Sequence, residues 1–286
     1  MRANVASRTA RAVALARALA TSGHGRVRID DPFAKKMLTR VGFRIAQLAA
    51  ATPSLVKLGT NAMSMGLIEH LALRTRAIDE AVVNAVERGA TQVVILGAGL
   101  DTRAHRLPLG ACRVFEVDHP ATQAVKIQRA SALPRRCHSL VYVPVDFVAT
   151  RFEDALREHG FDPRERSVWI WEGVTMYLPD HVVRSSVEHI AANASPGSVV
   201  ALSYVQRSEE GAMAHLLRAG AALLHAIGEP LHAEYSAGEM HALLQSAGFL
   251  VRADDCDESW LRAEGKRPVF TDALRAEHVL IAVRQS

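Results

Sequence analysis

The residues best suited to binding chemistry lie where a glycine turn follows an apolar run. The segment VVILGAGLDTRAHR occupies residues 93–106. Its four leading apolar residues predict a buried strand, and Gly97 and Gly99 predict a tight turn on which a ligand can lie against the backbone. Asp118 ends the next apolar run, RVFEVD, about 20 residues further on, where a carboxylate can accept both hydroxyls of a ribose. This pattern favours a ligand that carries an adenosine.

The turn departs at one position from the dinucleotide fingerprint. That fingerprint has a third glycine where this chain has Thr102. An NAD-dependent oxidoreductase stays as an alternative, but Thr102 counts against it.

Acidic residues also end the next two predicted strands. Asp146 and Phe147 close the run VPVDF, and Glu172 closes the run WIWE. The carboxyl ends of parallel strands meet at one edge of a sheet, and ligands bind there. We interpret the acids at these strand ends as a hydrogen-bonding rim for a ligand with an amino group, a ribose and a purine. Phe147 can stack against the purine.

The elements that must position these residues alternate between strand and helix. Such alternation predicts a doubly wound parallel sheet with right-handed crossovers. The expected strands are 92–96, 113–117, 140–145, 167–171, 199–204, 249–253 and 278–283. The expected helices are 6–21, 35–48, 68–88, 121–132, 151–159, 179–193 and 236–247.

The N-terminal region is expected to cover the sheet. Asp31 is predicted to cap the helix over 35–48. We expect one domain over 1–286, with a helical cap or lid over 1–67 and a Rossmann-like core over 68–286. Residues 1–50 are expected to close over the substrate as a lid and to contribute little to holding the sheet. An insertion is expected at about 207–235, and residues 254–276 are expected to be irregular.

Composition narrows the possible partners. The chain has 286 residues, of which 49% are apolar, and no apolar run is long enough for a membrane span. Its three cysteines and thirteen histidines show no metal-type spacing, so we expect no metal. With no targeting pattern, a cytoplasmic location without membrane partners is expected. We also expect no nucleic-acid partner, because aromatic residues are not interleaved with basic ones.

Positive charge is concentrated at the N-terminus. The first 50 residues hold ten Lys/Arg and two Asp, whereas the other 236 residues hold 24 basic and 28 acidic residues. A basic arm of this kind attracts anions, which favours a small anionic substrate. The sequence leaves the oligomeric state open.

Four of these segments together resemble the leucine carboxyl methyltransferase family, and specifically its bacterial S-adenosylmethionine-dependent O-methyltransferases. They are VVILGAGLDTRAHRLP, VFEVD, VPVDF and EGVTMYLP, and the motifs SRTA, DDPFA and RTRAID extend the resemblance over nearly the whole chain. The resemblance implies a Rossmann-like class I methyltransferase fold of the α/β class, with a seven-stranded, mostly parallel sheet and an N-terminal helical cap. It implies S-adenosyl-L-methionine as the cofactor.

The resemblance also implies roles for individual residues. Arg74 matches the arginine that pairs with the methionine carboxylate, and Glu172 matches the acid near the amino end of the cofactor. Arg17 is the candidate for a basic residue that the family carries in its N-terminal helix. The other implied contacts are the turn glycine Gly97, with Gly99 beside it, the ribose acid Asp118, and the adenine neighbours Asp146 and Phe147.

The sequence offers no clear catalytic base. Tyr177 and His181 follow the fourth strand and are the candidates for a catalytic role, and His119 is a further candidate base. A carboxylate acceptor is already ionised at neutral pH and needs no base. We therefore expect methylation of a small-molecule carboxylate. The alternatives are a phenolic or alcohol hydroxyl of a secondary metabolite, and a non-catalytic S-adenosylmethionine-binding protein.

Overall fold

A seven-stranded sheet organises the molecule. The computed structural model describes residues 8–53, 57, 66–147, 151–207, 232–266 and 277–286. The sheet order is β3-β2-β1-β4-β5-β7-β6, in which β7 is antiparallel to both of its neighbours and the other pairings are parallel. The strands are β1 Gln92–Leu96, β2 Arg113–Asp118, β3 Ser139–Pro144, β4 Ser167–Trp171, β5 Val199–Val205, β6 Phe249–Asp255 and β7 Glu277–Arg284.

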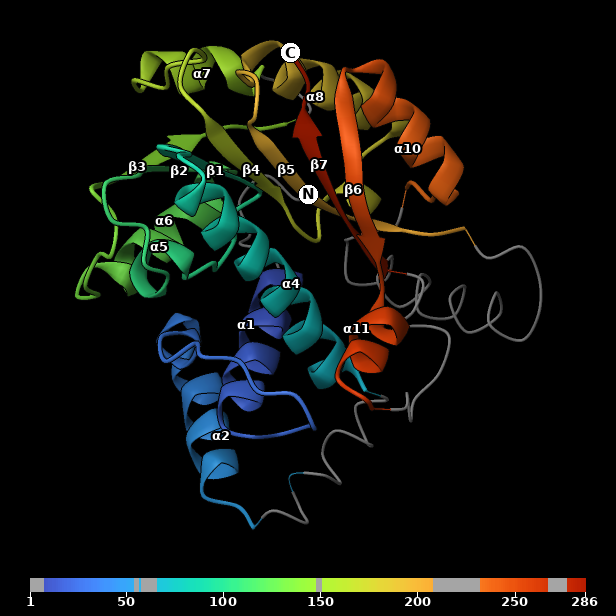
Figure 1. Cartoon of the computed structure of the whole chain (residues 1–286). Coiled ribbons are helices and arrows are strands. Elements are labelled where there is room, and N and C mark those ends of the chain that lie inside the picture. Colours follow the sequence, from blue (N-terminus) through green and yellow to red (C-terminus); the bar gives the residue numbers. More distant parts are fainter. Residues whose placement is uncertain (1–7, 54–56, 58–65, 148–150, 208–231, 267–276) are drawn as a thin grey trace.

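Helices cover both faces of this sheet (Figure 1). One face carries α4 Leu67–Glu87, α5 Arg103–Arg106 and α6 Pro120–Ala130, and the other carries α7 Phe152–Glu158, α8 Asp180–Asn193 and α10 Ala237–Ser246. Alternate residues of β1 supply both cores, because successive side chains of a strand point to opposite faces. Val94 and Leu96 pack in the core under α7 and α8, and Val93 and Ile95 pack against α4.

The first three elements cap the edge of the sheet where the parallel strands end. They are α1 Arg8–Thr21, the 3₁₀ helix η1 Ala34–Met37 and α2 Arg40–Ala50. α1 packs along α4, and its Ala14 and Ala20 are fully buried. Figure 1 shows α1 beside α4 and α2 further from the sheet, both away from α7 and α8.

Most predicted strand and helix positions agree with the structure to within about two residues. The predicted helix over 35–48 is wrong as a single element. The predicted N-cap, Asp31, is also wrong by two residues: η1 begins after Phe33, and Asp31 Oδ1 accepts a bond of 2.9 Å from the Ala34 amide in the turn that leads into it. The chain then turns extended at Leu38, and Thr39 caps a second helix, α2, by accepting from the Gly42 amide.

The predicted irregular stretch 254–276 is wrong in its first part. β6 continues to Asp255, and α11 follows over Asp257–Ala263 and packs on α4. The rest of that stretch from 267 on, most of the predicted insertion and most of 54–65 lie outside the described residues. Within the residues that the structure describes, no helix is long and apolar enough to cross a membrane.

Candidate functional site

The turn after β1 is built around two glycines with left-handed backbone. Gly97 has a φ of 66° and Gly99 a φ of 51°. A Cβ on Gly97 would collide with the side chain of Val174, and a Cβ on Gly99 would lie 3.3 Å from that of Ala10. Glycine at both positions therefore allows the left-handed turn and lets Val174 and Ala10 pack closely against it.

Asp118 stands beside this turn, as predicted. Its Oδ2 accepts a 2.5 Å bond from the Gly99 amide, and its Oδ1 accepts a 2.6 Å bond from the His119 amide. Burial raises the pKa of Asp118, and the two amide bonds oppose that rise. Each carboxylate oxygen can accept more than one hydrogen bond, so these fixed bonds orient the group and leave room for hydroxyl donors.

The third strand brings Asp146 and Phe147 to the same edge. The Val145 amide donates to the Asp118 carbonyl at 2.9 Å, which fixes where β3 leaves the sheet. Asp146 is exposed and Phe147 is half-buried. The Phe147 ring lies 5.9 Å from that of Phe152, so one side of it rests on the core.

Two carboxylates surround the guanidinium of Arg74. This residue comes from α4, and its Nε donates to Glu172 Oε1 at 2.9 Å. Its Nη1 donates to both oxygens of Glu277, at 2.7 and 2.8 Å. The structure thus places the two predicted site residues Arg74 and Glu172 in contact, and it adds Glu277 as a partner that sequence reasoning missed.

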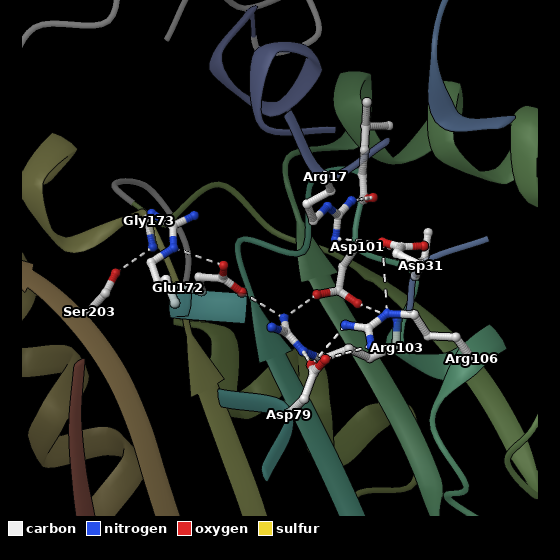
Figure 2. A network of polar contacts seen from close by, with 12 residues as sticks. Arg17, Asp31, Asp79, Asp101, Arg103, Arg106, Glu172, Gly173 and Ser203 are labelled. Carbon is white, nitrogen blue, oxygen red and sulfur yellow. Dashed lines mark hydrogen bonds and ion pairs between the residues drawn. The ribbon is translucent and has the colours of Figure 1, made fainter. Parts of the chain in front are cut away.

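Arg103 links Glu172 to the glycine turn. It is fully buried, and it donates to Glu172 at 2.7 Å, to Asp79 at 2.7 Å and to Asp101 at 2.5 Å. Figure 2 shows it in the middle of these three acids. Arg106 adds two bonds to Asp79, of 2.6 and 2.8 Å. These residues therefore brace the turn.

The electrostatics of this network keep its acids ionised. Burial pushes the pKa of Glu172 upward, but the positive charges of Arg103 and Arg74 outweigh it and hold the pKa below its ordinary value. Burial likewise opposes ionisation of Glu277, yet Arg74 and His70 bring its pKa down to about 2. Both acids are therefore anions at neutral pH.

Arg17 reaches the site from the cap. Its Nη2 donates to the Leu100 carbonyl at 2.5 Å, and its Nη1 lies 3.6 Å from Asp31 Oδ2. The structure thus ties α1 to the turn after β1 through a cation (Figure 2). The role that the resemblance implied for Arg17 at the cofactor stays a prediction.

The candidate bases have ordinary structural surroundings. His119 caps α6, where its Nδ1 accepts from the Ala121 amide at 3.2 Å. His181 is exposed in the first turn of α8, and Tyr177 is half-buried at the end of η2 Thr175–Tyr177. No catalytic role is assigned to them by these contacts. Among the described residues, no group of three or more His, Cys, Asp or Glu side chains could hold a metal ion.

The residues at this edge fit S-adenosyl-L-methionine. The glycine turn after β1 would lie against the cofactor, and Asp118 would accept its ribose hydroxyls. Arg74 and Glu172 offer one cation and one anion for the zwitterionic methionine end. The His70–Glu277 pair behind Arg74 was not predicted, because no local sequence motif indicates it.

The comparisons with known proteins agree with this geometry. The chain matches the leucine carboxyl methyltransferase family over residues 10–191, and it belongs to that family. A protein of Mycobacterium avium described as an S-adenosyl-L-methionine-dependent methyltransferase is 37% identical over 202 residues, covering 68% of this chain and 65% of that protein. One of Mycolicibacterium smegmatis, similarly described, is 38% identical and covers 71% of this chain and 67% of that protein. The match thus spans just under two thirds of the length of the first relative.

The fold is shared more widely than the sequence. A duf574 family protein from Streptomyces avermitilis superposes with a TM-score of 0.61 at 14% identity, over 98% of both chains. The predictions of the family, of its Rossmann-like methyltransferase fold and of S-adenosyl-L-methionine as its cofactor are confirmed.

Proposed function

We propose that this protein is an S-adenosylmethionine-dependent O-methyltransferase that converts a carboxylate of a small anionic molecule into its methyl ester. The observation that carries the proposal is the joining, at one sheet edge, of the Gly97 turn, Asp118 and the Arg74–Glu172 pair. When bound, S-adenosyl-L-methionine supplies a sulfonium methyl group, which an acceptor oxygen takes as the carbon–sulfur bond breaks.

The residues of this chain act by binding and orientation. Asp118, already fixed by two backbone amides, accepts the ribose hydroxyls. Arg74 meets the methionine carboxylate and Glu172 the amino group. Phe147, resting on Phe152, offers a ring face to the adenine. Holding both ends of the cofactor fixes the reacting methyl group against an acceptor, and this positioning is the main contribution that such a reaction requires.

We infer the acceptor class from the ionisation state of the acceptor and from the positive charge of the N-terminal residues. A carboxylate with a pKa of about 4 is ionised at neutral pH, so no residue has to remove a proton. The contacts of His119 are those of a helix cap, which supports an acceptor that needs no base. The ten Lys/Arg among the first 50 residues, which include Arg17 at the turn, would attract an anion to this edge.

Product chemistry tests the proposal. The protein is incubated with methyl-labelled S-adenosyl-L-methionine and a panel of small carboxylic acids and phenols, and transfer is read as a mass shift. We expect a labelled product that mild alkali cleaves, because an ester hydrolyses and a methyl ether does not. An alkali-stable product would point to a hydroxyl acceptor on a secondary metabolite, and cofactor binding without any transfer would support a non-catalytic binder.

A further inference from the structure

We propose that Glu277, the first residue of β7, is a positioning residue that orients Arg74 toward the carboxylate of the bound cofactor, with His70 and Asp257 holding Glu277 in place. This inference rests on the proposed function, because it deepens the role given there to Arg74. It assigns part of the cofactor site to the C-terminal third of the chain.

The bonds around Glu277 form a continuous line across three elements. Arg74 Nη1 contacts both of its oxygens, at 2.7 and 2.8 Å, and His70 Nε2 lies 2.8 Å from its Oε2. His70 Nδ1 lies 2.8 Å from Asp257 Oδ1 in α11. The His70 side chain is only 2% exposed, so both of its ring nitrogens are committed to carboxylates within the protein.

The spacing on α4 explains why one acid can serve both cations. His70 and Arg74 are four residues apart, so they lie on one face of the helix, one turn from each other. That face looks onto the start of β7, where Glu277 pairs in register with Val205 of β5.

Two fixed carboxylates determine where the rest of the guanidinium points. The group is planar and carries five N–H donors in a rigid fork. Glu172 fixes Nε and Glu277 fixes Nη1, so the direction of the Nη2 donors follows from these two contacts. Nη2 lies against Gly173 at the end of β4, 3.6 Å from where a Cβ on that residue would stand. The donors that remain are thus set at the edge where the strand acids gather.

A merely structural role for Glu277 predicts a different outcome from a positioning role. If it only joins α4 to β7, its loss lowers stability and weakens every ligand equally. If it orients Arg74, its loss weakens ligands that carry the methionine carboxylate and spares those that lack it. S-adenosylhomocysteine and methylthioadenosine form such a pair, because the second lacks the amino and carboxylate groups.

The experiment is calorimetry of both ligands on the full chain. Wild type should bind S-adenosylhomocysteine more tightly than methylthioadenosine. In Glu277→Gln, the affinity for S-adenosylhomocysteine should fall by about tenfold or more, and that for methylthioadenosine should not change. Glu277→Asp, which keeps the charge, should recover part of the loss. Glu80→Gln, an exposed acid on the same helix, is the matched control and should resemble wild type.

The possible outcomes separate this inference from the proposed function. Equal losses for both ligands in Glu277→Gln, or no loss for either, would overturn the positioning role and leave the cofactor assignment standing. Wild type that does not distinguish the two ligands, or Arg74→Ala that leaves their ratio unchanged, would overturn both. Should Glu277→Gln fail to fold, Glu277→Asp and His70→Gln decide, and each must weaken S-adenosylhomocysteine selectively.

Discussion

Asp118 is the residue on which the cofactor assignment can be tested most directly. Asp118→Ala should weaken S-adenosylhomocysteine binding by about 1.5–3 kcal/mol, because two ribose hydroxyls lose a charged acceptor. Calorimetry measures the effect. Asp154→Ala, at an exposed site on α7, is the control and should bind like wild type. If a folded Asp118→Ala variant kept the affinity of wild type, the ribose would not bind at Asp118.

Gly97 is expected to be irreplaceable for two separable reasons. Its φ of 66° costs about 1–2 kcal/mol with any Cβ, and a Cβ would also strike Val174. Gly110→Ala, with a φ of 49° and no atom within 4 Å of the added Cβ, should show the backbone cost alone. Urea unfolding should therefore find Gly97→Ala less stable than Gly110→Ala.

A second substitution tests the steric part of this argument. Val174→Ala removes the atoms that the new Cβ would meet. The double variant should be more stable than the sum of the two single losses predicts, since the clash is shared between both positions. Additive losses would show that Val174 moves aside without cost.

What could be predicted at this scale was the set of strand-end residues. Gly97, Asp118 and Glu172 follow apolar runs, and an open parallel sheet brings such ends together. Glu277 could not be found in this way, because it begins an antiparallel strand and lies 203 residues from Arg74. Only the place of β7 in the sheet, beside β5 and in contact with α4, brings it to Arg74.

Among the elements, α4, α11 and β7 meet at a junction that charged side chains hold together. Burial lowers the pKa of His70, but Asp257 and Glu277 outweigh it and raise the pKa to about 9 from 6.5. A raised pKa gives stability that is complete below about pH 6.5 and is lost as the pH rises through 9. Glu277, with a pKa of about 2 against 4.5, gives stability that is complete above 4.5 and is lost as the pH falls through 2.

The junction should therefore be strongest between about pH 4.5 and 6.5. Relative to His70→Gln, wild type should lose roughly 2–3 kcal/mol of unfolding free energy between about pH 6 and pH 10. Urea unfolding at several pH values measures the difference. His181→Gln, at an exposed site on α8, should follow wild type throughout. Parallel curves for wild type and His70→Gln would contradict the charged junction.

Helices at this scale were predictable where their caps are local. Ser236 starts α10 with a capping box that involves Glu239, and the pattern is visible in the sequence. The division of 35–48 was harder to predict, because Thr39 is also a tolerable helix-interior residue. Burial of Met37 and Leu38 against the cap core accompanies the break. α11 was missed because its seven residues are mostly polar and derive their order from α4.

For the whole molecule, the relation of the cap to the sheet decides whether the first 50 residues are a detachable lid. Their glycine break at 23–25 and their charge favour a lid that closes over substrate and contributes little to the core. Within this region α1 packs against the rest of the molecule: its Leu19 and Ala20 share a core with Leu71 and Leu73 of α4, whereas α2 buries only Ala46. Leu100, in the glycine turn, is buried in a core with Ala14. The cap and the cofactor turn are therefore stabilised together.

A chain that begins at Ile68 should consequently be much less stable than the full chain. Removal of the cap would expose Ile68, Leu71 and Leu73, which are each less than 5% exposed. Each such side chain is worth about 1.5–3 kcal/mol, so together they approach the whole stability of a typical domain. Circular dichroism and thermal unfolding should find the shortened chain unfolded or strongly destabilised, and limited proteolysis of the full chain should find α1 nearly as protected as the sheet. If the shortened chain instead melts within a few degrees of the full chain, the first 50 residues would be a detachable lid.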